Sequence, residues 1–215
     1  MNVCLMFAMK EEAAPFLEPF QEILGREDLT VYRHHRLGLG KLYVVISGIG
    51  AANTMVAAMF MKENFGVNHI INIGSCGANY QGIENAPVIG DIVRPLSFIQ
   101  GDFDLSAFGN NTKTPSAVDN DEGLLCLTYQ RFVTEKVAEP PYIVDMDAYF
   151  LKTFCDRNHM EFAAFKVISD CADSEAADTF TKNIEEVTQN SVEIVGNYLR
   201  NCYQAYCPEL RVLWK

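Results

Sequence analysis

Long apolar segments are missing from this sequence of 215 residues. No run reaches the roughly 18 apolar residues that a helix needs to span a bilayer, so the sequence predicts no contact with a membrane. The first residues also lack the basic stretch that precedes the apolar part of a signal peptide. We therefore interpret the apolar start of the chain as a buried strand, and we expect a cytoplasmic protein.

Basic residues are scarce. The chain has 17 Lys and Arg against 28 Asp and Glu, which gives a formal net charge of -11 at pH 7. A protein that binds nucleic acid needs a basic face to meet the phosphate backbone. The charge therefore argues against a nucleic-acid partner, and it leaves a small-molecule substrate open.

Paired cysteine motifs are also absent. The seven cysteines are spread along the chain without a CxxC pair, and their odd number favours free thiols in a reducing compartment. Cys155 and His159 have a helical spacing that could hold a metal, but no second pair of ligands lies nearby. We expect neither a metal site nor a cofactor.

Short apolar runs alternate with helical patterns along the chain. No repeat or linker interrupts this alternation, so we expect one domain over 1–215 with an α/β fold and a largely parallel sheet. The polar stretch 101–122 is predicted to be a loop, and the helix over 51–64, apolar on nearly all sides, is expected to be well buried. Strands are predicted over 2–8, 31–37, 42–47, 68–73, 89–93, 123–127, 142–146 and 162–169, and helices over 51–64, 147–158 and 179–204.

Acidic residues follow several of the predicted strands. Asp170 stands at the exit of the last strand, ahead of the helix that is expected from about residue 179. Ligands of open α/β sheets gather at the carboxyl ends of strands, so Asp170 is placed to do chemistry. Glu12 follows the first strand and Asp147 follows the strand over 142–146, although each also fits an ordinary acid at the start of a helix.

Glycine-containing turns follow two other strands. Ser47-Gly48-Ile49-Gly50 is similar to a dinucleotide-binding GxGxxG but lacks the third glycine, and a close backbone approach explains its glycines equally well. In Asn72–Ala78, backbone N–H groups and the Ser75 hydroxyl can face a ligand oxygen. A simple tight turn is the alternative.

In this order, these segments resemble the purine nucleoside phosphorylase and nucleosidase superfamily, and most of all the methylthioadenosine/S-adenosylhomocysteine nucleosidases. The likeness covers about residues 1–200 and depends on the joint order and spacing of the motifs. They are Ala-Met-x-Glu-Glu (8–12), Ser-Gly-Ile-Gly (47–50), Asn-x-Gly-Ser-x-Gly (72–77), Gly-Asp-Ile-Val (90–93), Val-Asp-Met-Asp-Ala (144–148) and Ile-Ser-Asp (168–170).

The resemblance implies a three-layer αβα sandwich around a mixed, partly barrel-like sheet. It also implies hydrolysis of the N-glycosidic bond of a purine nucleoside, in nucleoside metabolism such as methionine salvage. By this match, Asp170 protonates the leaving base at N7, Ser169 orients the Asp170 carboxyl, and Glu12 takes a proton from water. Asp147 and the Met146 backbone would hold the ribose hydroxyls.

Two further segments match binding positions of the family. Phe132 and Val133 fall where the family stacks the base and reads its edge, in a segment that is only loosely alike. Leu105 and Phe108 are large apolar residues in a polar stretch, and they match positions that cross a two-fold interface in nucleosidases. We therefore expect a homodimer in which they close the partner's site, although burial under their own domain would also explain them.

The sequence leaves two alternatives open: a phosphate-dependent phosphorylase and a non-catalytic nucleoside-binding protein. Phosphorylases of this superfamily carry an arginine where this chain has Asn72, and carboxylates would repel phosphate, so water is the expected nucleophile.

The chain also departs from the nucleosidases. Asp147 is one methylene shorter than the family glutamate, so its ribose contact must shift or pass through water. Lys166 replaces an arginine and is not an equivalent donor.

Overall fold

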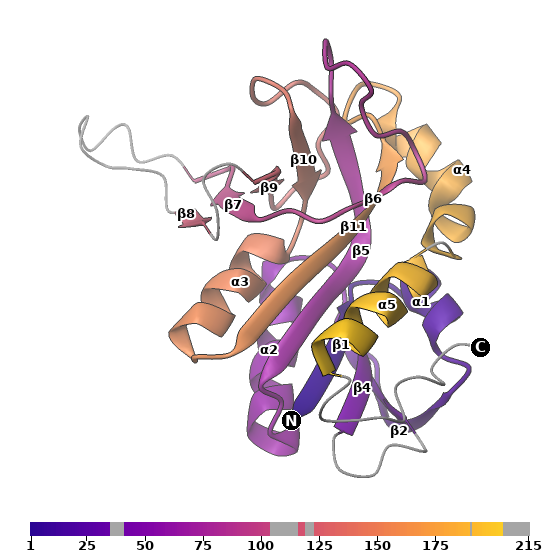
Figure 1. Ribbon diagram of the computed structural model, residues 1–215, viewed down its shortest axis with the longest axis vertical. Helices are drawn as coiled ribbons and strands as arrows, with labels where there is room; N and C mark the ends of the chain where they lie inside the picture. Colours follow the sequence, from indigo (N-terminus) through magenta and orange to yellow (C-terminus); the bar gives the residue numbers. More distant parts are fainter. Residues whose placement is uncertain (35–40, 104–115, 119–122, 190, 204–215) are drawn as a thin grey trace.

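The computed structural model of the chain describes residues 1–34, 41–103, 116–118, 123–189 and 191–203 (Figure 1). Within these residues, eleven strands form one mixed sheet. The strands are β1 (Asn2–Phe7), β2 (Phe20–Arg26), β3 (Leu29–His34), β4 (Lys41–Ile46), β5 (His69–Asn79), β6 (Ile92–Val93), β7 (Ser97–Gln100), β8 (Ser116–Val118), β9 (Leu125–Thr128), β10 (Tyr142–Asp145) and β11 (Glu161–Asp170).

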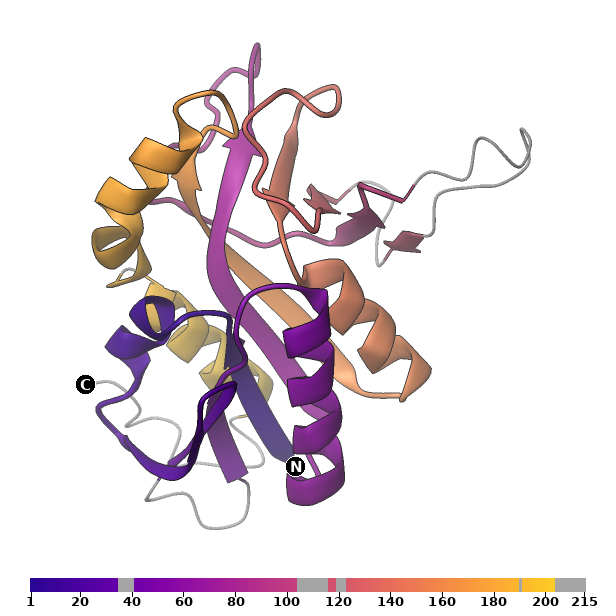
Figure 2. The same cartoon turned by 180° about the vertical axis from the view of Figure 1, so that it is seen from behind.

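Helices cover both faces of this sheet (Figures 1 and 2). They are α1 (Lys10–Ala13), which continues into the short 3-10 helix η1 (Ala14–Phe16), α2 (Ala51–Phe65), α3 (Ala148–Arg157), α4 (Ala176–Gln189) and α5 (Ser191–Tyr203). None of the described helices is long and apolar enough to cross a bilayer.

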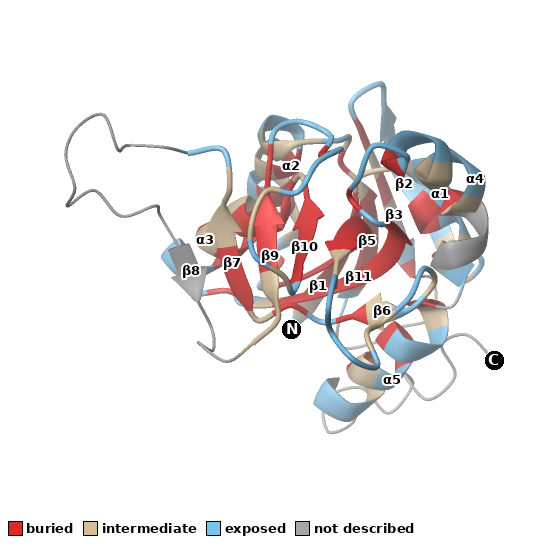
Figure 3. Cartoon of the chain, turned by 90° about the horizontal axis from the view of Figure 1, so that it is seen from above, coloured by how far each residue is buried: buried red, intermediate tan, exposed pale blue. Residues whose placement is uncertain are grey.

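The alternation of side chains along β1 places its residues in two separate cores. Leu5 and Phe7 pack with Phe16 and with α5, whereas Met6 packs on the other face with Met61 of α2. Successive side chains of a strand point to opposite faces, so an apolar strand needs helices on both sides. Viewed from above, buried strands lie between the more exposed helices (Figure 3). The predicted three-layer αβα architecture with a mixed sheet is confirmed.

The strand order explains why the sheet is mixed. The order runs β2-β3-β4-β1-β5-β10-β9-β7-β8, and β11 lies beside β5 and β6. The pairs β1–β4, β1–β5 and β5–β11 are parallel, whereas β10 runs antiparallel to β5. The predicted parallel core is therefore present, with antiparallel strands added at its edges.

β5 changes partner halfway along one edge. Its residues 69–72 pair with β1 and its residues 77–79 pair with β10, while β11 occupies the opposite edge. Residues 73–76 therefore have no strand partner on that edge among the described strands. The sheet divides here, and polar groups of β5 become available to a site.

Several expectations for the elements need correction. The glycine-containing turn expected after Ile73 is absent, because β5 continues to Asn79. α2 is not buried all round, because Val56 and Met59 on its outer face are 58% and 55% exposed. The single helix expected over 179–204 is two helices, α4 and α5, of which α5 packs Val195 and Leu199 into the same core as Leu5 and Phe7. Strands β2, β7 and β8 were not expected, and β8 lies in the stretch predicted as a loop.

Candidate active site

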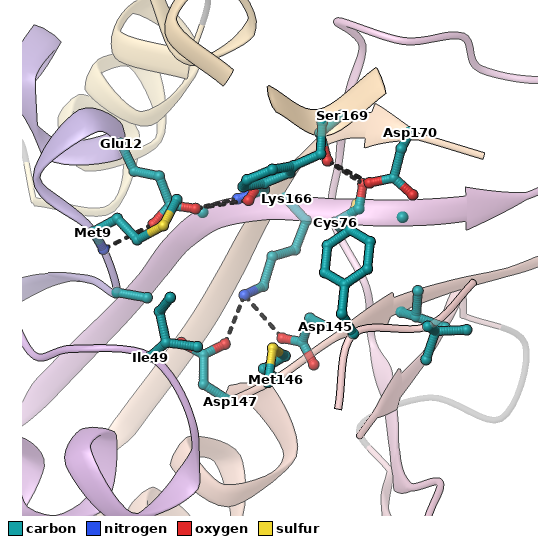
Figure 4. Close-up of a pocket in the computed structure, with 18 of the residues that line it drawn as sticks. Met9, Glu12, Ile49, Cys76, Asp145, Met146, Asp147, Lys166, Ser169 and Asp170 are labelled. Atoms are coloured by element: carbon teal, nitrogen blue, oxygen red, sulfur yellow. Dashed lines mark hydrogen bonds and ion pairs between the residues drawn. The ribbon is translucent and has the colours of Figure 1, made fainter. Parts of the chain in front are cut away.

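A cavity opens where β1 and β10 separate along β5 (Figure 4). Leu105 and Phe108 lie outside the described residues. The other predicted site residues all line this one cavity, although they come from distant parts of the sequence. They are Glu12, Ser75, Phe132, Val133, Met146, Asp147, Ser169 and Asp170.

Glu12 is anchored by backbone and side-chain donors from two elements. Its Oε1 accepts hydrogen bonds from the N–H and the hydroxyl of Ser75, both at 2.8 Å. Its Oε2 accepts from the N–H of Met9 at 3.1 Å, as an acid in the first turn of a helix commonly does. Glu12 is therefore both an acid at the start of a helix and a residue of the cavity, so the two interpretations drawn from the sequence are compatible. The Ser75 donors are aimed at Glu12.

Asp170 sits at a bulge at the end of β11. Ile168 pairs with Cys76 but Asp170 pairs with the next residue of β5, so Ser169 is an extra residue. A bulge of this kind re-aims side chains, which explains how two consecutive residues both line the cavity. Asp170 is 2% exposed, and its Oδ1 accepts from the N–H of Ala172 at 2.9 Å.

Burial raises the pKa of Asp170, while the hydrogen bonds from the Ala172 N–H and the Ser169 hydroxyl act in the opposite direction. The Ser169 hydroxyl has one hydrogen and two acceptors in reach, Asp170 Oδ2 at 2.8 Å and the Cys76 carbonyl oxygen at 3.1 Å. When it donates to Cys76, its oxygen can accept from a protonated Asp170. Ser169 can therefore partner both forms of the acid.

Two glycines of β5 make room for these carboxyl groups. A Cβ on Gly77 would lie 2.7 Å from Oδ1 of Asp170 and 2.9 Å from a methyl group of Val144. A Cβ on Gly74 would lie 3.1 Å from Oε1 of Glu12. The glycines of the Asn-x-Gly-Ser-x-Gly motif are thus explained by close approach of side chains.

A buried ion cluster forms the floor of the cavity (Figure 4). Lys166 Nζ lies 2.8 Å from Asp145 Oδ2 and 2.9 Å from Asp147 Oδ1. Asp145 is held further by the hydroxyl of Thr128 at 2.6 Å and the N–H of Ala148 at 3.0 Å. Asp145 thus accepts from three groups and serves as the anchor of the cluster.

The cluster shifts the pKa values of Asp145 and Asp147 in opposite directions. Burial opposes ionisation of both, but Lys166 and the Thr128 hydrogen bond hold the pKa of Asp145 below its usual value. For Asp147, burial and the nearby Asp145 outweigh Lys166 and raise the pKa to about 6. Burial works against the charge of Lys166, yet Asp145 and Asp147 raise its pKa well above the usual value. The ammonium group is therefore neutralised inside the cluster.

Apolar side chains line the outer part of the cavity. Phe132 and Phe180 pack edge to face with ring centroids 5.8 Å apart, and Phe132 is 41% exposed. Ile49 also lines the cavity and is 51% exposed, whereas Val133 is buried. This end suits a flat aromatic ring and apolar substituents.

Asp145 and Phe180 are among the residues that line the cavity and that sequence reasoning missed. Asp145 lies in the same short segment as Asp147, and the two acids around Met146 were a signal for it together with Lys166, a charged residue inside an apolar strand. Phe180 lies on α4, and no motif in its surroundings marked it. Within the described residues, no cluster of three or more His, Cys, Asp or Glu side chains is arranged to hold a metal ion.

Comparisons with known proteins agree with the resemblance found in the sequence motifs. A sequence profile of the phosphorylase superfamily matches residues 2–142. A 5'-methylthioadenosine/S-adenosylhomocysteine nucleosidase of an Exiguobacterium species is 25% identical over 238 residues, covering 95% of this chain and 100% of the relative. An aminodeoxyfutalosine nucleosidase of Campylobacter jejuni is 30% identical over 116 residues, covering 51% of this chain and 47% of the relative.

The fold also matches solved structures. The 5'-methylthioadenosine/S-adenosylhomocysteine nucleosidase of Neisseria meningitidis, solved with methylthio-immucillin-A, superposes with a TM-score of 0.77 at 22% identity, covering 93% of this chain and 99% of the other. The sheet and its flanking helices thus have the fold of this nucleosidase. Because the profile covers more than half of the chain, this protein belongs to the phosphorylase superfamily.

Proposed function

We propose that this protein hydrolyses the N-glycosidic bond of a purine nucleoside of the methylthioadenosine or S-adenosylhomocysteine type. The observation that carries the proposal is the pair of buried carboxyl groups, Glu12 and Asp170, in different environments on one cavity. Two acids whose surroundings differ can take different protonation states, one as acid and one as base. The nucleosidase relatives support the same reaction class.

Asp170 is the general acid of this proposal. Breaking the bond between C1' and N9 moves electron density onto the purine, which leaves more easily if N7 is protonated. The raised pKa of Asp170 favours the proton-carrying form that this step needs. Ser169 orients the carboxyl and, by turning its hydroxyl to Cys76, can accept from the protonated acid.

Glu12 is the general base. It takes one proton of a water molecule whose oxygen bonds to C1' as the bond to N9 breaks, so the products are the free base and the free sugar. The donors from Met9 and Ser75 fix the orientation of the carboxylate. Oε1 already accepts two hydrogen bonds, whereas Oε2 accepts one, so Oε2 keeps the lone pair that can take the proton from water.

The remaining parts of the cavity have binding roles. Asp147, with the Met146 backbone, holds the ribose hydroxyls at the floor of the cavity. Phe132 stacks on the base, and the main chain at Val133 reads its edge. Phe180 and Ile49 supply an apolar surface for the 5' substituent, which suits a thioether.

The charges of the cavity favour water over phosphate as the nucleophile. Among the described residues that line it, four are acids and two are cations. One of the cations, Lys166, is neutralised by Asp145 and Asp147. An anion would meet a net negative wall, which argues against the phosphorylase alternative. The presence of Glu12 and Asp170 argues against a non-catalytic binding protein.

The direct test is release of adenine from 5'-methylthioadenosine and from adenosine, with and without phosphate, and identification of the sugar product. We expect adenine and a free sugar, at a rate that phosphate does not raise. A sugar 1-phosphate formed only with phosphate would establish phosphorolysis. Binding without any release of base would establish a binding protein.

We also propose a homodimer in which Leu105 and Phe108 close the partner's site, and the neighbouring Phe103 is 36% exposed. A monomer by light scattering at micromolar concentration would contradict it, and an unchanged Michaelis constant in a dimeric Phe108→Ala variant would place Phe108 away from the site.

We also propose a cytoplasmic location, with which the six free cysteines among the described residues are consistent. Cell fractionation tests this.

A further inference from the structure

Asn72 occupies an unusual place in the centre of the sheet. It lies on β5 between Met6 of β1 and Ala164 of β11, and it is fully buried. Its Nδ2 donates a hydrogen bond to Asp147 Oδ2 at 3.1 Å. Its Oδ1 has no hydrogen-bond partner among the described residues. The side chain is therefore only half satisfied.

A half-satisfied amide is an unfavourable choice for a protein core. A buried acceptor without a donor loses its hydrogen bonds to water and gains nothing in exchange. A leucine of similar size would remove this cost at a position surrounded by apolar strands. An exception of this kind calls for a functional reason, and the bond to Asp147 provides one.

Asp147 is held from two sides. Lys166 donates to Oδ1 and Asn72 donates to Oδ2, so the plane of the carboxylate is fixed at both oxygens. Lys166 is shared with Asp145 and hangs on a flexible stem. Asn72 is a planar donor on the central strand and serves Asp147 alone. The reverse orientation of the amide would set Oδ1 against the carboxylate, two acceptors face to face.

We infer that Asn72 is a positioning residue for ribose recognition. It fixes the Asp147 carboxylate so that the remaining lone pairs face the ribose hydroxyls. A neutral donor achieves this without adding a charge to the cluster of Asp145, Asp147 and Lys166. The inference rests on the proposed function, because it takes the ligand of Asp147 to be the sugar of a nucleoside.

The test is a cycle between the residue and the hydroxyl groups of the ligand. Dissociation constants are measured by titration calorimetry in Glu12→Gln protein, in which turnover is blocked. The ligands are 5'-methylthioadenosine and its 2'-deoxy and 3'-deoxy counterparts, with and without Asn72→Leu. We expect Asn72→Leu to weaken binding of the parent nucleoside roughly tenfold. It should weaken the binding of at least one deoxy counterpart much less, because that ligand lacks the hydroxyl group whose contact with Asp147 Asn72 supports.

Thr153→Val is the matched control. Thr153 Oγ1 is the other buried side-chain oxygen without a partner among the described residues, and Thr153 does not line the cavity. This variant should leave all three dissociation constants unchanged. The urea midpoint of Asn72→Leu is measured as well, because the substitution removes an unbonded acceptor but also takes the donor from the buried Asp147 Oδ2.

The outcomes separate the inference from the proposed function. If Asn72→Leu weakens all three ligands equally, or none of them, Asn72 does not position Asp147 and the inference is wrong. If the unsubstituted protein binds these nucleosides but releases no base, hydrolysis is wrong while the cycle still decides the role of Asn72. If no nucleoside binds, both are wrong.

Discussion

The carboxyl groups of Glu12 and Asp170 belong to the same cavity but are supported in different ways. Glu12 accepts from three donors that come from two elements, the start of α1 and the part of β5 that has no strand partner on one edge. Asp170 has two partners, and both are neighbours on its own chain segment, Ser169 and Ala172. Hydrogen bonds from two separate elements thus fix the Glu12 side chain, whereas a local bulge of β11 fixes the Asp170 side chain.

The two serines show what this difference means for chemistry. Ser75 directs its hydroxyl and its N–H to one oxygen of Glu12, so Glu12 is held as an acceptor, which is the role of a base. Ser169 can donate to Asp170 or, by turning to Cys76, accept from it. The site therefore assigns base and acid through the partners of each carboxyl group. The predictions below separate these two roles.

The largest effect is expected for Glu12→Gln. The amide keeps the shape of the side chain but cannot take a proton from water, so we expect kcat to fall by on the order of 10³-fold or more. The dissociation constant of the nucleoside should change little, since a base acts on the chemical step. Rate measurements with titration calorimetry separate the two. Lost binding with unchanged kcat would make Glu12 a structural helix acid.

Asp170→Asn is expected to have the next largest effect. It removes the proton for the leaving purine, and we expect turnover of 5'-methylthioadenosine to fall by on the order of 10²-fold. Steady-state rates of adenine release provide the measurement. A variant with nearly unchanged activity on the nucleoside would remove Asp170 from the acid role.

These two residues could be found from the sequence because acids at strand ends have a physical meaning in α/β folds. Asp147 was also found in this way. The division of β5 between β1 and β10 could not be found, because it depends on pairings between residues far apart in the chain. Strand β2 was missed for a related reason, since all of its side chains are exposed or half-buried and its apolar residues Phe20, Ile23 and Leu24 do not alternate with polar ones.

The cluster beneath the ribose position shows the same limit. A lysine in an apolar strand signals a buried partner, but the sequence does not say that Asp145 and Asp147 share it. Likewise, the sequence shows only that Asn72 stands where phosphorylases carry an arginine. Its contact with Asp147 is visible only in three dimensions. Phe180 gave no signal because its contact with Phe132 joins a helix and a distant loop.

Replacing the two serines should give smaller and different effects. Ser75→Ala removes one of three donors to Glu12, and we expect a loss of roughly tenfold or less in kcat. In Ser169→Ala, a hydrogen bond that lowers the pKa of Asp170 is lost, so the alkaline limb of the kcat/KM profile should move to higher pH. Ser75→Ala should leave that limb in place. Equal shifts in both variants would contradict the separate roles.

The smallest effect is expected from pH at the ribose position. The pKa of Asp147 is about 6, raised by burial and by Asp145 against the effect of Lys166. As the pH falls through this value, Asp147 gains a proton and loses acceptor capacity, so the dissociation constant of the nucleoside should rise a few-fold. Asp147→Asn should bind weakly with little pH dependence over the same range. Calorimetry in Glu12→Gln protein gives both curves.

The division of labour between Glu12 and Asp170 is tested most directly with a riboside whose leaving group needs no proton. In 4-nitrophenyl riboside the phenolate leaves unaided, so a general acid contributes little while a base for water is still required. We predict that Asp170→Asn hydrolyses this substrate within about threefold of the unsubstituted protein, whereas Glu12→Gln keeps its full loss. If Asp170→Asn loses as much activity on this riboside as on 5'-methylthioadenosine, the assignment of acid and base is wrong.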